Sequence, residues 1–121
     1  MKSLKDYRYA SSPAEAVALR RQGPGRGIYI AGGTDLFLAM PPDVDFVVDV
    51  NGAGLDGVER QESGDLVIGA AATLQKVANS PAALAFAGGA VAHAAVHCAN
   101  RPVRTTATLG GNLCNALPSA D

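Results

Sequence analysis

The sequence predicts an α/β (α+β) fold in which a small parallel βαβ unit is followed by the start of an antiparallel-sheet unit. Two observations support this prediction. Along residues 12–50, helix patterns alternate with continuous apolar strand patterns, which is typical of a parallel sheet covered on both faces. Two short strand patterns then flank a turn at residues 63–65, as in a β-hairpin. We therefore place a boundary near Gly57 and expect two subdomains, 1–57 and 58–121.

Composition excludes several classes of partner. The 121 residues include 10 basic and 11 acidic side chains, so nothing indicates binding to nucleic acid or to an anionic membrane surface. The longest alanine-valine run, residues 82–99, is interrupted by two glycines and two histidines, and no membrane span is expected. A secretory signal has an apolar segment behind its charged N-terminal residues, and this N-terminus lacks one. We therefore expect a cytoplasmic protein.

In the first unit we expect one helix and two strands. Residues 12–15, Ser-Pro-Ala-Glu, combine a serine cap, a proline at the first helical position and an acid in the first turn. The sequence Gly-Pro-Gly at 23–25 ends this helix. Residues 27–31 and 45–50 are the strands, and residues 35–40 between them can form a helical turn that two prolines stop.

In the second unit Thr73 is expected to cap a helix that reaches Ala78 and is interrupted near Pro81. A longer alanine-rich helix over residues 82–99 follows, weakened by about 1 kcal/mol at each of its two glycines. Residues 100–121 are expected to form an ordered loop, because threonine and asparagine side chains bond to backbone or ligand atoms at defined geometry.

Two glycine-rich segments carry the functional signal. The first, Ala31-Gly32-Gly33-Thr34-Asp35, follows a predicted strand, and the second, Thr108-Leu109-Gly110-Gly111-Asn112, lies near the C-terminus. Adjacent glycines let the backbone approach a ligand and direct successive N–H groups at one anion. Neither segment contains a lysine, so the pair predicts a site that holds a diphosphate mainly through main-chain donors. For the first segment alone, a tight turn that needs glycine for its geometry is the alternative.

Other chemical signals in the sequence are weaker. His93 and His97 have the spacing of a metal pair on a helix, but no third ligand is evident, and ordinary polar positions are favoured over a zinc site. Cys98 and Cys114 lack metal-ligand spacing and are expected to be free thiols, buried or half-buried.

The remaining charged residues are expected to have structural roles. Arg101 and Arg104 are expected to face solvent, with contact to a partner subunit or to the dinucleotide as the alternative. Asp43, Asp45 and Asp49 are interpreted as cap and turn residues and not as acid-base groups.

At its two glycine segments the chain resembles the FAD-binding subunit or domain of molybdenum hydroxylases, the relatives of xanthine dehydrogenase and carbon monoxide dehydrogenase. In that family, segments close to residues 31–36 and 108–113 both face the flavin dinucleotide, and a segment like residues 118–121 follows the second. The intervening elements occur in the expected order. The resemblance implies a two-layer FAD-binding fold of the vanillyl-alcohol-oxidase-like type, with FAD between the N-terminal α/β subdomain (1–57) and the second subdomain (58–121), which is incomplete at its C-terminus.

The resemblance also implies roles for single residues. The first loop would wrap the diphosphate with its N–H groups and the Thr34 hydroxyl. Because a carboxylate beside an anion is unfavourable, we expect on physical grounds that the Asp35 side chain turns back to cap loop amides or the following helix turn. The second segment would meet the diphosphate and ribityl region, and Asp121 would accept from a hydroxyl. Cys98 and Ala99 match positions that border the isoalloxazine, where an aromatic residue is common. The expected cofactor-binding residues are Ile30, Ala31, Gly32, Gly33, Thr34, Asp35, Leu36, Cys98, Ala99, Thr108, Gly110, Gly111, Asn112, Asn115 and Asp121.

The function implied by the resemblance is that of an oxidoreductase component. Its flavin would relay electrons from a molybdenum site, through iron-sulfur clusters, to NAD, a quinone or another acceptor, and no residue would act as an acid or base. The expected partners are a molybdenum-cofactor subunit and an iron-sulfur subunit, or a second copy of the chain. Family members continue past the position of Asp121, so a fragment or a shortened relative is expected. The alternatives are a cofactor-free interaction or assembly module and, less favoured, a binder of ADP or a sugar nucleotide.

Overall fold

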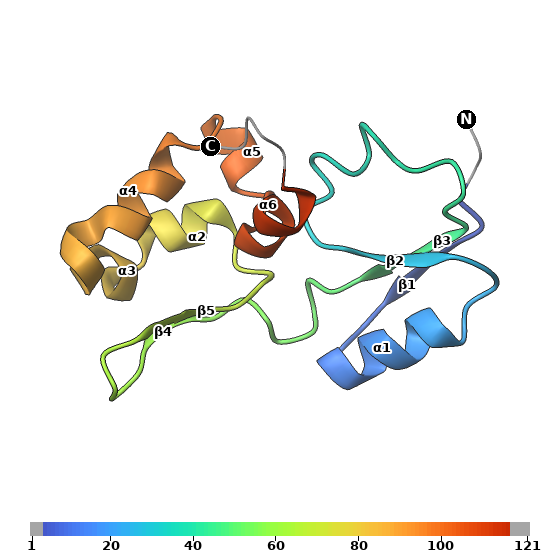
Figure 1. The fold of residues 1–121 in the computed structure, drawn as a ribbon, viewed down its shortest axis with the longest axis horizontal. Coiled ribbons are helices and arrows are strands. Elements are labelled where there is room, and N and C mark those ends of the chain that lie inside the picture. The colour runs from blue at the N-terminus through green and yellow to red at the C-terminus, as the bar shows by residue number, and fades with distance from the viewer. Residues whose placement is uncertain (1–3, 117–121) are drawn as a thin grey trace.

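Three parallel strands form the sheet of the N-terminal half. The computed structural model, which describes residues 4–116, places β1 (Asp6–Tyr9), β3 (Phe46–Asp49) and β2 (Gly27–Ile30) in the order β1-β3-β2. Helix α1 (Pro13–Arg21) connects β1 to β2 and packs on the sheet (Figure 1). The predicted parallel βαβ unit is confirmed. Strand β1 was not predicted. It is an edge strand with charged residues, and its side chains alternate between half-buried and exposed, so its sequence lacks a continuous apolar pattern.

Helix α1 begins as the sequence predicts. Ser12 is the N-cap, and its hydroxyl accepts the backbone N–H of Glu15 at 3.1 Å, while Pro13 occupies the first turn, where no intrahelical N–H bond is needed. The Glu15 carboxylate accepts from the hydroxyl and the N–H of Ser11, and these hydrogen bonds lower the pKa of Glu15. This exchange of hydrogen bonds around the cap fixes where the chain turns from β1 into the helix.

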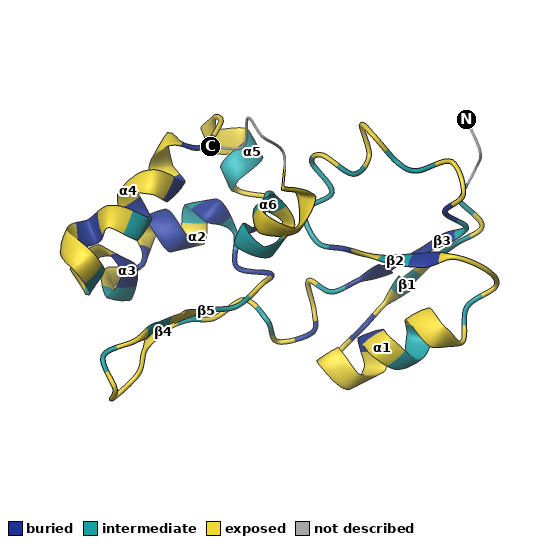
Figure 2. Cartoon of the chain, viewed as in Figure 1, coloured by how far each residue is buried: buried dark blue, intermediate teal, exposed yellow. Residues whose placement is uncertain are grey.

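The central strand β3 is buried along its whole length, in agreement with the predicted strand covered on both faces (Figure 2). Phe46 and Val48 point to one face and pack with Ala16 of α1. Val47 points to the other face, where it packs with Ile30 and with apolar residues of the segment between β2 and β3. That second face is therefore covered by the loop that contains the first glycine pair and not by a helix.

The C-terminal half has its own apolar cluster. The predicted hairpin is confirmed as β4 (Val58–Arg60) paired antiparallel with β5 (Leu66–Ile68). Helix α2 (Leu74–Asn79) follows, and the Thr73 hydroxyl caps it by accepting the N–H of Lys76 at 3.1 Å, as predicted. The hairpin packs on a cluster of buried alanines and valine from the helices: Ala72, Val77, Ala78, Ala83, Ala92 and Ala95. The subdomain boundary near Gly57 stays a prediction.

The single long helix expected over residues 82–99 is wrong. The chain forms α3 (Pro81–Ala85), a 3-10 turn η1 (Phe86–Gly89) and α4 (Ala90–His97). Ala87, Gly88 and Gly89 all have positive φ angles, of 48°, 66° and 82°. The two glycines therefore do more than weaken a helix, because left-handed residues in succession reverse the chain and let α4 pack against α2 and α3.

The ordered loop expected from residue 100 onward is also wrong within the described part of the chain. Asn100 caps α5 (Arg101–Arg104) by accepting the N–H of Val103, and Thr108 caps α6 (Leu109–Asn115) by accepting the N–H of Gly111. The same polar side chains that suggested a loop are thus helix caps. The second glycine pair lies in the first turn of α6.

The aspartates around β3 have two kinds of role. Asp43 forms an ion pair with the Arg26 side chain, and Asp45 accepts the backbone N–H of Arg26 at 2.9 Å. These two agree with the predicted turn positions. Asp49, in contrast, is buried with 8% of its surface exposed, at the carboxyl end of the strand.

The buried Asp49 carboxylate organises the end of the sheet. One oxygen accepts from the Tyr7 hydroxyl at 2.7 Å, and the other accepts the N–H of Asn51 at 2.8 Å. The side-chain amide of Asn51 in turn donates to the carbonyl of Ala31 at 2.9 Å. Burial, together with the neighbouring carboxylate, raises the pKa of Tyr7 above its ordinary value of 10.0.

We expect Tyr7→Phe to lower stability at neutral pH and to flatten its dependence on alkaline pH. The variant leaves a buried carboxylate oxygen without its donor, at a cost of roughly 1–3 kcal/mol. Because folding raises the pKa of Tyr7, the stability it contributes is present below about pH 10 and is lost as the pH rises through the folded-state value. Urea unfolding at several pH values measures both effects. Tyr9→Phe, at a position with 74% exposure, is the control. Parallel pH profiles for wild type and Tyr7→Phe would contradict the assignment.

Candidate functional site

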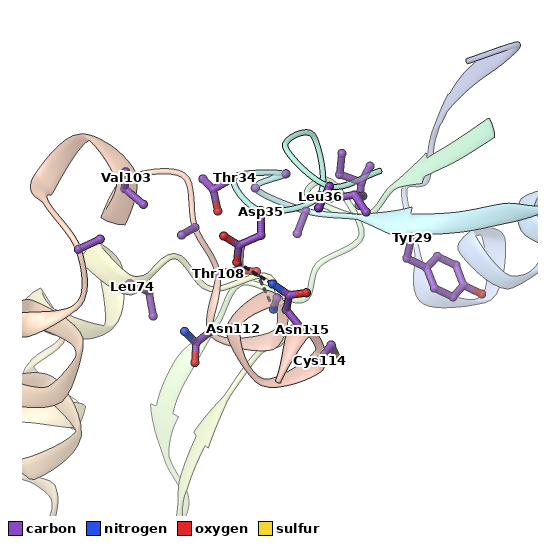
Figure 3. A pocket seen from close by; sticks show the side chains of 18 of the residues that line it. Tyr29, Thr34, Asp35, Leu36, Leu74, Val103, Thr108, Asn112, Cys114 and Asn115 are labelled. Carbon is purple, nitrogen blue, oxygen red and sulfur yellow. Dashed lines mark hydrogen bonds between the residues drawn. The ribbon is translucent and has the colours of Figure 1, made fainter. Parts of the chain in front are cut away.

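A cleft of about 670 Å³ lies between the end of β2 and helix α6. One wall consists of residues 28–36 with Ala39 and Pro41, and the opposite wall comes from the C-terminal half (Figure 3). The first wall begins at the carboxyl end of a parallel strand, which is where open α/β sheets place their ligands. The two halves of the chain therefore share one site.

Most of the residues predicted to bind a cofactor meet in this cleft. Gly33 and Gly111, one from each glycine pair, both line it. Gly110 does not, and Asp121 lies outside the described residues. The predicted residues that line the cleft are Ile30, Ala31, Gly32, Gly33, Thr34, Asp35, Leu36, Cys98, Ala99, Thr108, Gly111, Asn112 and Asn115.

The first glycine loop offers unused main-chain donors. Within residues 4–116, the consecutive N–H groups of residues 32–36 donate no hydrogen bond. The loop is nonetheless held in place, because the carbonyl of Gly33 accepts from Phe37 and the carbonyl of Asp35 accepts from Leu38. Gly33 has a φ of +69°, a left-handed conformation that occurs in the backbone nests that bind anions. Consecutive open N–H groups beside such a residue suit an anionic ligand.

The second glycine pair was also expected to offer main-chain donors to a ligand, but the backbone N–H groups there already donate to acceptors within the chain. Leu109 donates to the carbonyl of Ala72 at 3.0 Å, and Gly110 donates to the carbonyl of Ala70 at 2.9 Å. The N–H groups of Gly111 and Asn112 donate to the hydroxyl and the carbonyl of Thr108. Among the described residues, the consecutive open main-chain donors therefore lie on the first loop and not in the first turn of α6. The side chains that α6 contributes to the cleft are those of Asn112, Cys114 and Asn115, of which the two asparagines can form hydrogen bonds with a ligand through their amides (Figure 3).

Gly32 in the first glycine pair and Gly110 in the second permit close packing against backbone atoms. A Cβ at Gly32 would collide with the carbonyl oxygen of Thr106 and lie 3.0 Å from the Cα of Ala107. A Cβ at Gly110 would lie 2.5 Å from the carbonyl oxygen of Ala70. Gly32 thus brings the two walls into backbone contact, whereas Gly110 seats α6 on its own half.

The sequence suggested that the Asp35 carboxylate caps its own loop, and this expectation is wrong. Its Oδ2 accepts from the side-chain amide of Asn115 on the opposite wall at 3.0 Å. Among the described residues that line the cleft, Asp35 is the one that carries a charge, and none is a lysine or arginine. The donors that this lining offers to an anion are therefore backbone and side-chain dipoles.

Arg104 holds the corner of the cleft formed by Cys98 and Ala99. Its guanidinium donates to the carbonyls of these residues at 3.0 and 3.3 Å, and to the side chain of Gln75 at 3.2 Å. Ala99 has a φ of +46°, which is strained for a residue with a side chain. Arg104 is half-buried, so its expected exposure to solvent is wrong, whereas Arg101 is exposed.

Sequence reasoning missed Asn51 as part of the site. Its side-chain amide anchors the carbonyl of Ala31, at the start of the first loop. Asn51 follows the second predicted strand directly, and the carboxyl ends of neighbouring parallel strands meet at one edge of a sheet. That topology is the signal that could have identified it.

The described residues contain no group of three or more His, Cys, Asp or Glu side chains suited to a metal ion, and none of their helices is long and apolar enough to cross a bilayer. The Nδ1 atom of His97 lies 2.7 Å from the carbonyl oxygen of His93, within hydrogen-bond distance. Cys98 and Cys114 do not form a disulfide. Cys98 is buried as expected, whereas Cys114 is exposed, which the sequence did not predict.

Comparisons with known proteins agree on one family. The family model described as the FAD binding domain in molybdopterin dehydrogenase matches residues 2–121. The xanthine dehydrogenase FAD-binding subunit of Escherichia coli O157:H7 is 33% identical over 125 residues. Among solved structures, the reconstituted CO dehydrogenase from Oligotropha carboxidovorans matches with a TM-score of 0.87 and 28% identity. Quinoline 2-oxidoreductase from Pseudomonas putida 86 matches with a TM-score of 0.87 and 26% identity.

These matches cover the whole of the present chain but less than half of each relative. The alignments span 100% of this chain, 42% of the Escherichia coli subunit and 43% of the matched chain in each of the two solved structures. The chain therefore spans less than half the length of the relatives it matches.

We expect Gly32→Ala to separate the two walls of the cleft and to destabilise the fold. The added methyl group overlaps the backbone at residues 106–107, and overpacking of this kind costs roughly 1–3 kcal/mol. Gly57→Ala is the matched control, because a Cβ there has no neighbour closer than 3.9 Å. Urea unfolding of both variants measures the difference. Equal stability of Gly32→Ala and Gly57→Ala would show that the walls do not depend on this contact.

Proposed function

The chain belongs to the family of FAD-binding domains found in molybdopterin dehydrogenases, and from this membership we propose that the cleft between β2 and α6 holds FAD. One observation supports the proposal most strongly. The N–H groups of residues 32–36 lack acceptors within the described chain and line a cleft that both halves share. Donors left open in an otherwise satisfied backbone suit an anionic ligand. The diphosphate is the part of FAD that carries this charge.

In the proposed complex, the first loop binds the diphosphate. The N–H groups of Gly33, Thr34 and Asp35 donate to phosphate oxygens, and the Thr34 hydroxyl adds a further donor. Each charge-assisted hydrogen bond contributes roughly 1.5–3 kcal/mol, so several of them hold a dianion without any lysine. The Asn51 side chain keeps this loop in position through the carbonyl of Ala31.

The opposite wall binds through side chains. Asn112 and Asn115 can each donate and accept, which suits the hydroxyl groups of the ribityl chain and the ring amides of the flavin. The Thr108 hydroxyl caps α6 through its oxygen and keeps its own hydrogen free to donate to the ligand. Cys98 and Ala99 border the isoalloxazine in this proposal, with the apolar side chains of Leu74 and Val103 beside them.

We propose electron transfer as the role of the loaded site. Bound FAD supplies the redox chemistry, and the residues of the chain bind the cofactor, orient it and exclude water from one side. Among the matched proteins are a xanthine dehydrogenase subunit and a CO dehydrogenase. On that basis the proposed partners are a molybdenum-cofactor subunit and an iron-sulfur subunit that delivers electrons to the flavin. Asp121 keeps its proposed role as an acceptor for a cofactor hydroxyl.

Titration of the 121-residue chain with FAD tests the proposal. We expect quenching of flavin fluorescence with a micromolar Kd. Gly33→Ala should weaken binding by about tenfold or more, because it forces a residue with a side chain into φ +69° and places a Cβ 2.7 Å from the Phe37 ring. Equal competition by ADP would indicate an adenine-nucleotide site instead. A wild-type chain that binds no FAD would favour the cofactor-free module.

The affinity for FAD should depend little on salt. No lysine or arginine lies among the described residues that line the cleft, so few ionic contacts are available for salt to screen. We expect the Kd to change by less than about twofold between roughly 50 and 500 mM NaCl. Titrations at both salt concentrations provide the measurement. A steep loss of affinity with salt would mean that basic side chains, and not amides, hold the diphosphate.

A further inference from the structure

We propose that Asp35 and Asn115 form a latch that closes the cleft and keeps the loop amides open for the diphosphate. The inference rests on the proposed binding of FAD and goes beyond it, because it assigns a positioning function to one contact. Residues 35 and 115 are separated by 80 positions in the sequence, and their hydrogen bond is 3.0 Å long. In Figure 3 the two side chains point toward each other across the cleft. Within residues 4–116, it is the one hydrogen bond that joins the loop after β2 to α6.

Both partners are mounted on ordered backbone. The carbonyl of Asp35 accepts from Leu38 and Ala39, each at 3.1 Å, which fixes the turn that carries the carboxylate. Asn115 is the last residue of α6, and the N–H of Ala116 after it donates to the carbonyl of Asn112. The contact therefore defines a distance between two anchored segments. Both side chains are exposed, so the contact can open without disturbing any of the three apolar clusters.

The latch has an electrostatic consequence. A short carboxylate side chain commonly bonds to backbone N–H groups near it in sequence. If Asp35 did so, it would occupy the donors of residues 32–36 and would place a negative charge beside the diphosphate. The amide of Asn115 instead draws the carboxylate to the opposite wall. Asn115 thus positions Asp35, and through it protects the phosphate site.

The test compares the release rate of FAD among variants of the full 121-residue chain. Asn115→Ala removes the donor, and we expect FAD to dissociate about tenfold faster, as the loss of one charge-assisted hydrogen bond would produce. Asp35→Asn should have a smaller effect because its amide oxygen still accepts. Asn115→Asp opposes two carboxylates and should release FAD faster than Asn115→Ala. Asn79→Ala is the matched control, an exposed asparagine that likewise ends a helix.

The double variant Asp35→Asn with Asn115→Asp exchanges the two groups and restores a donor-acceptor pair. We expect its release rate to return to within about threefold of wild type, a rescue that a merely structural effect of either substitution would not give. A double variant as fast as Asn115→Asp alone would overturn the latch, as would wild-type release from Asn115→Ala.

Thermal unfolding of the ligand-free variants separates this inference from the proposed function. If the latch exists, Asp35→Ala, Asn115→Ala and the double alanine variant lower the Tm by the same amount, because each removes the same contact. Additive shifts would overturn it. If wild type binds no FAD but the shifts are non-additive, the contact stands and the proposed function fails. If wild type binds FAD and the shifts in Tm are additive, the proposed function stands and the latch fails.

Discussion

The close approach of Gly32 to the backbone of residues 106–107 is the contact on which the site depends. The segment 106–109 is fixed to its own half, because Leu74 donates to the carbonyl of Ala107 and Leu109 donates to the carbonyl of Ala72. Gly32 adds the first loop to this arrangement, and only a residue without a Cβ can lie so close to a carbonyl. At this point the separation of the cleft walls is therefore set by backbone contact.

The two glycine pairs divide two tasks in the same way. One glycine of each pair, Gly32 or Gly110, permits close packing, and the other, Gly33 or Gly111, lines the cleft, which Gly32 lines as well. The pairs differ in their hydrogen bonds, since the helix start at α6 has an acceptor for each of its first donors, whereas the loop after β2 leaves its N–H groups open. An open N–H group is satisfied by water until a ligand replaces it, so binding replaces water without breaking a protein contact.

Where short-range chemistry decides structure, the sequence was a good guide. The caps at Ser12 and Thr73, the buried strand β3 and the hairpin β4–β5 all follow from local patterns. Long-range packing decided the rest. The break at residues 86–89 depends on α4 folding back onto α2, and the opposite roles of the two glycine pairs depend on the acceptors that lie beside them. The contact of Asp35 with Asn115 joins residues far apart in the chain, which no local pattern reveals.

Because each half supplies one wall, ligand binding and the relative position of the halves are thermodynamically linked. A ligand that contacts the loop after β2 and α6 together stabilises the arrangement in which both are in reach, and the gain grows with the ratio of ligand concentration to Kd. The reverse also follows, since any change that moves the halves apart must lower the affinity by the same free energy. None of the three apolar clusters formed by the described residues spans the two halves. The contact at Gly32, the bond between Asp35 and Asn115 and the ligand itself therefore act on the same separation, and each strengthens the others.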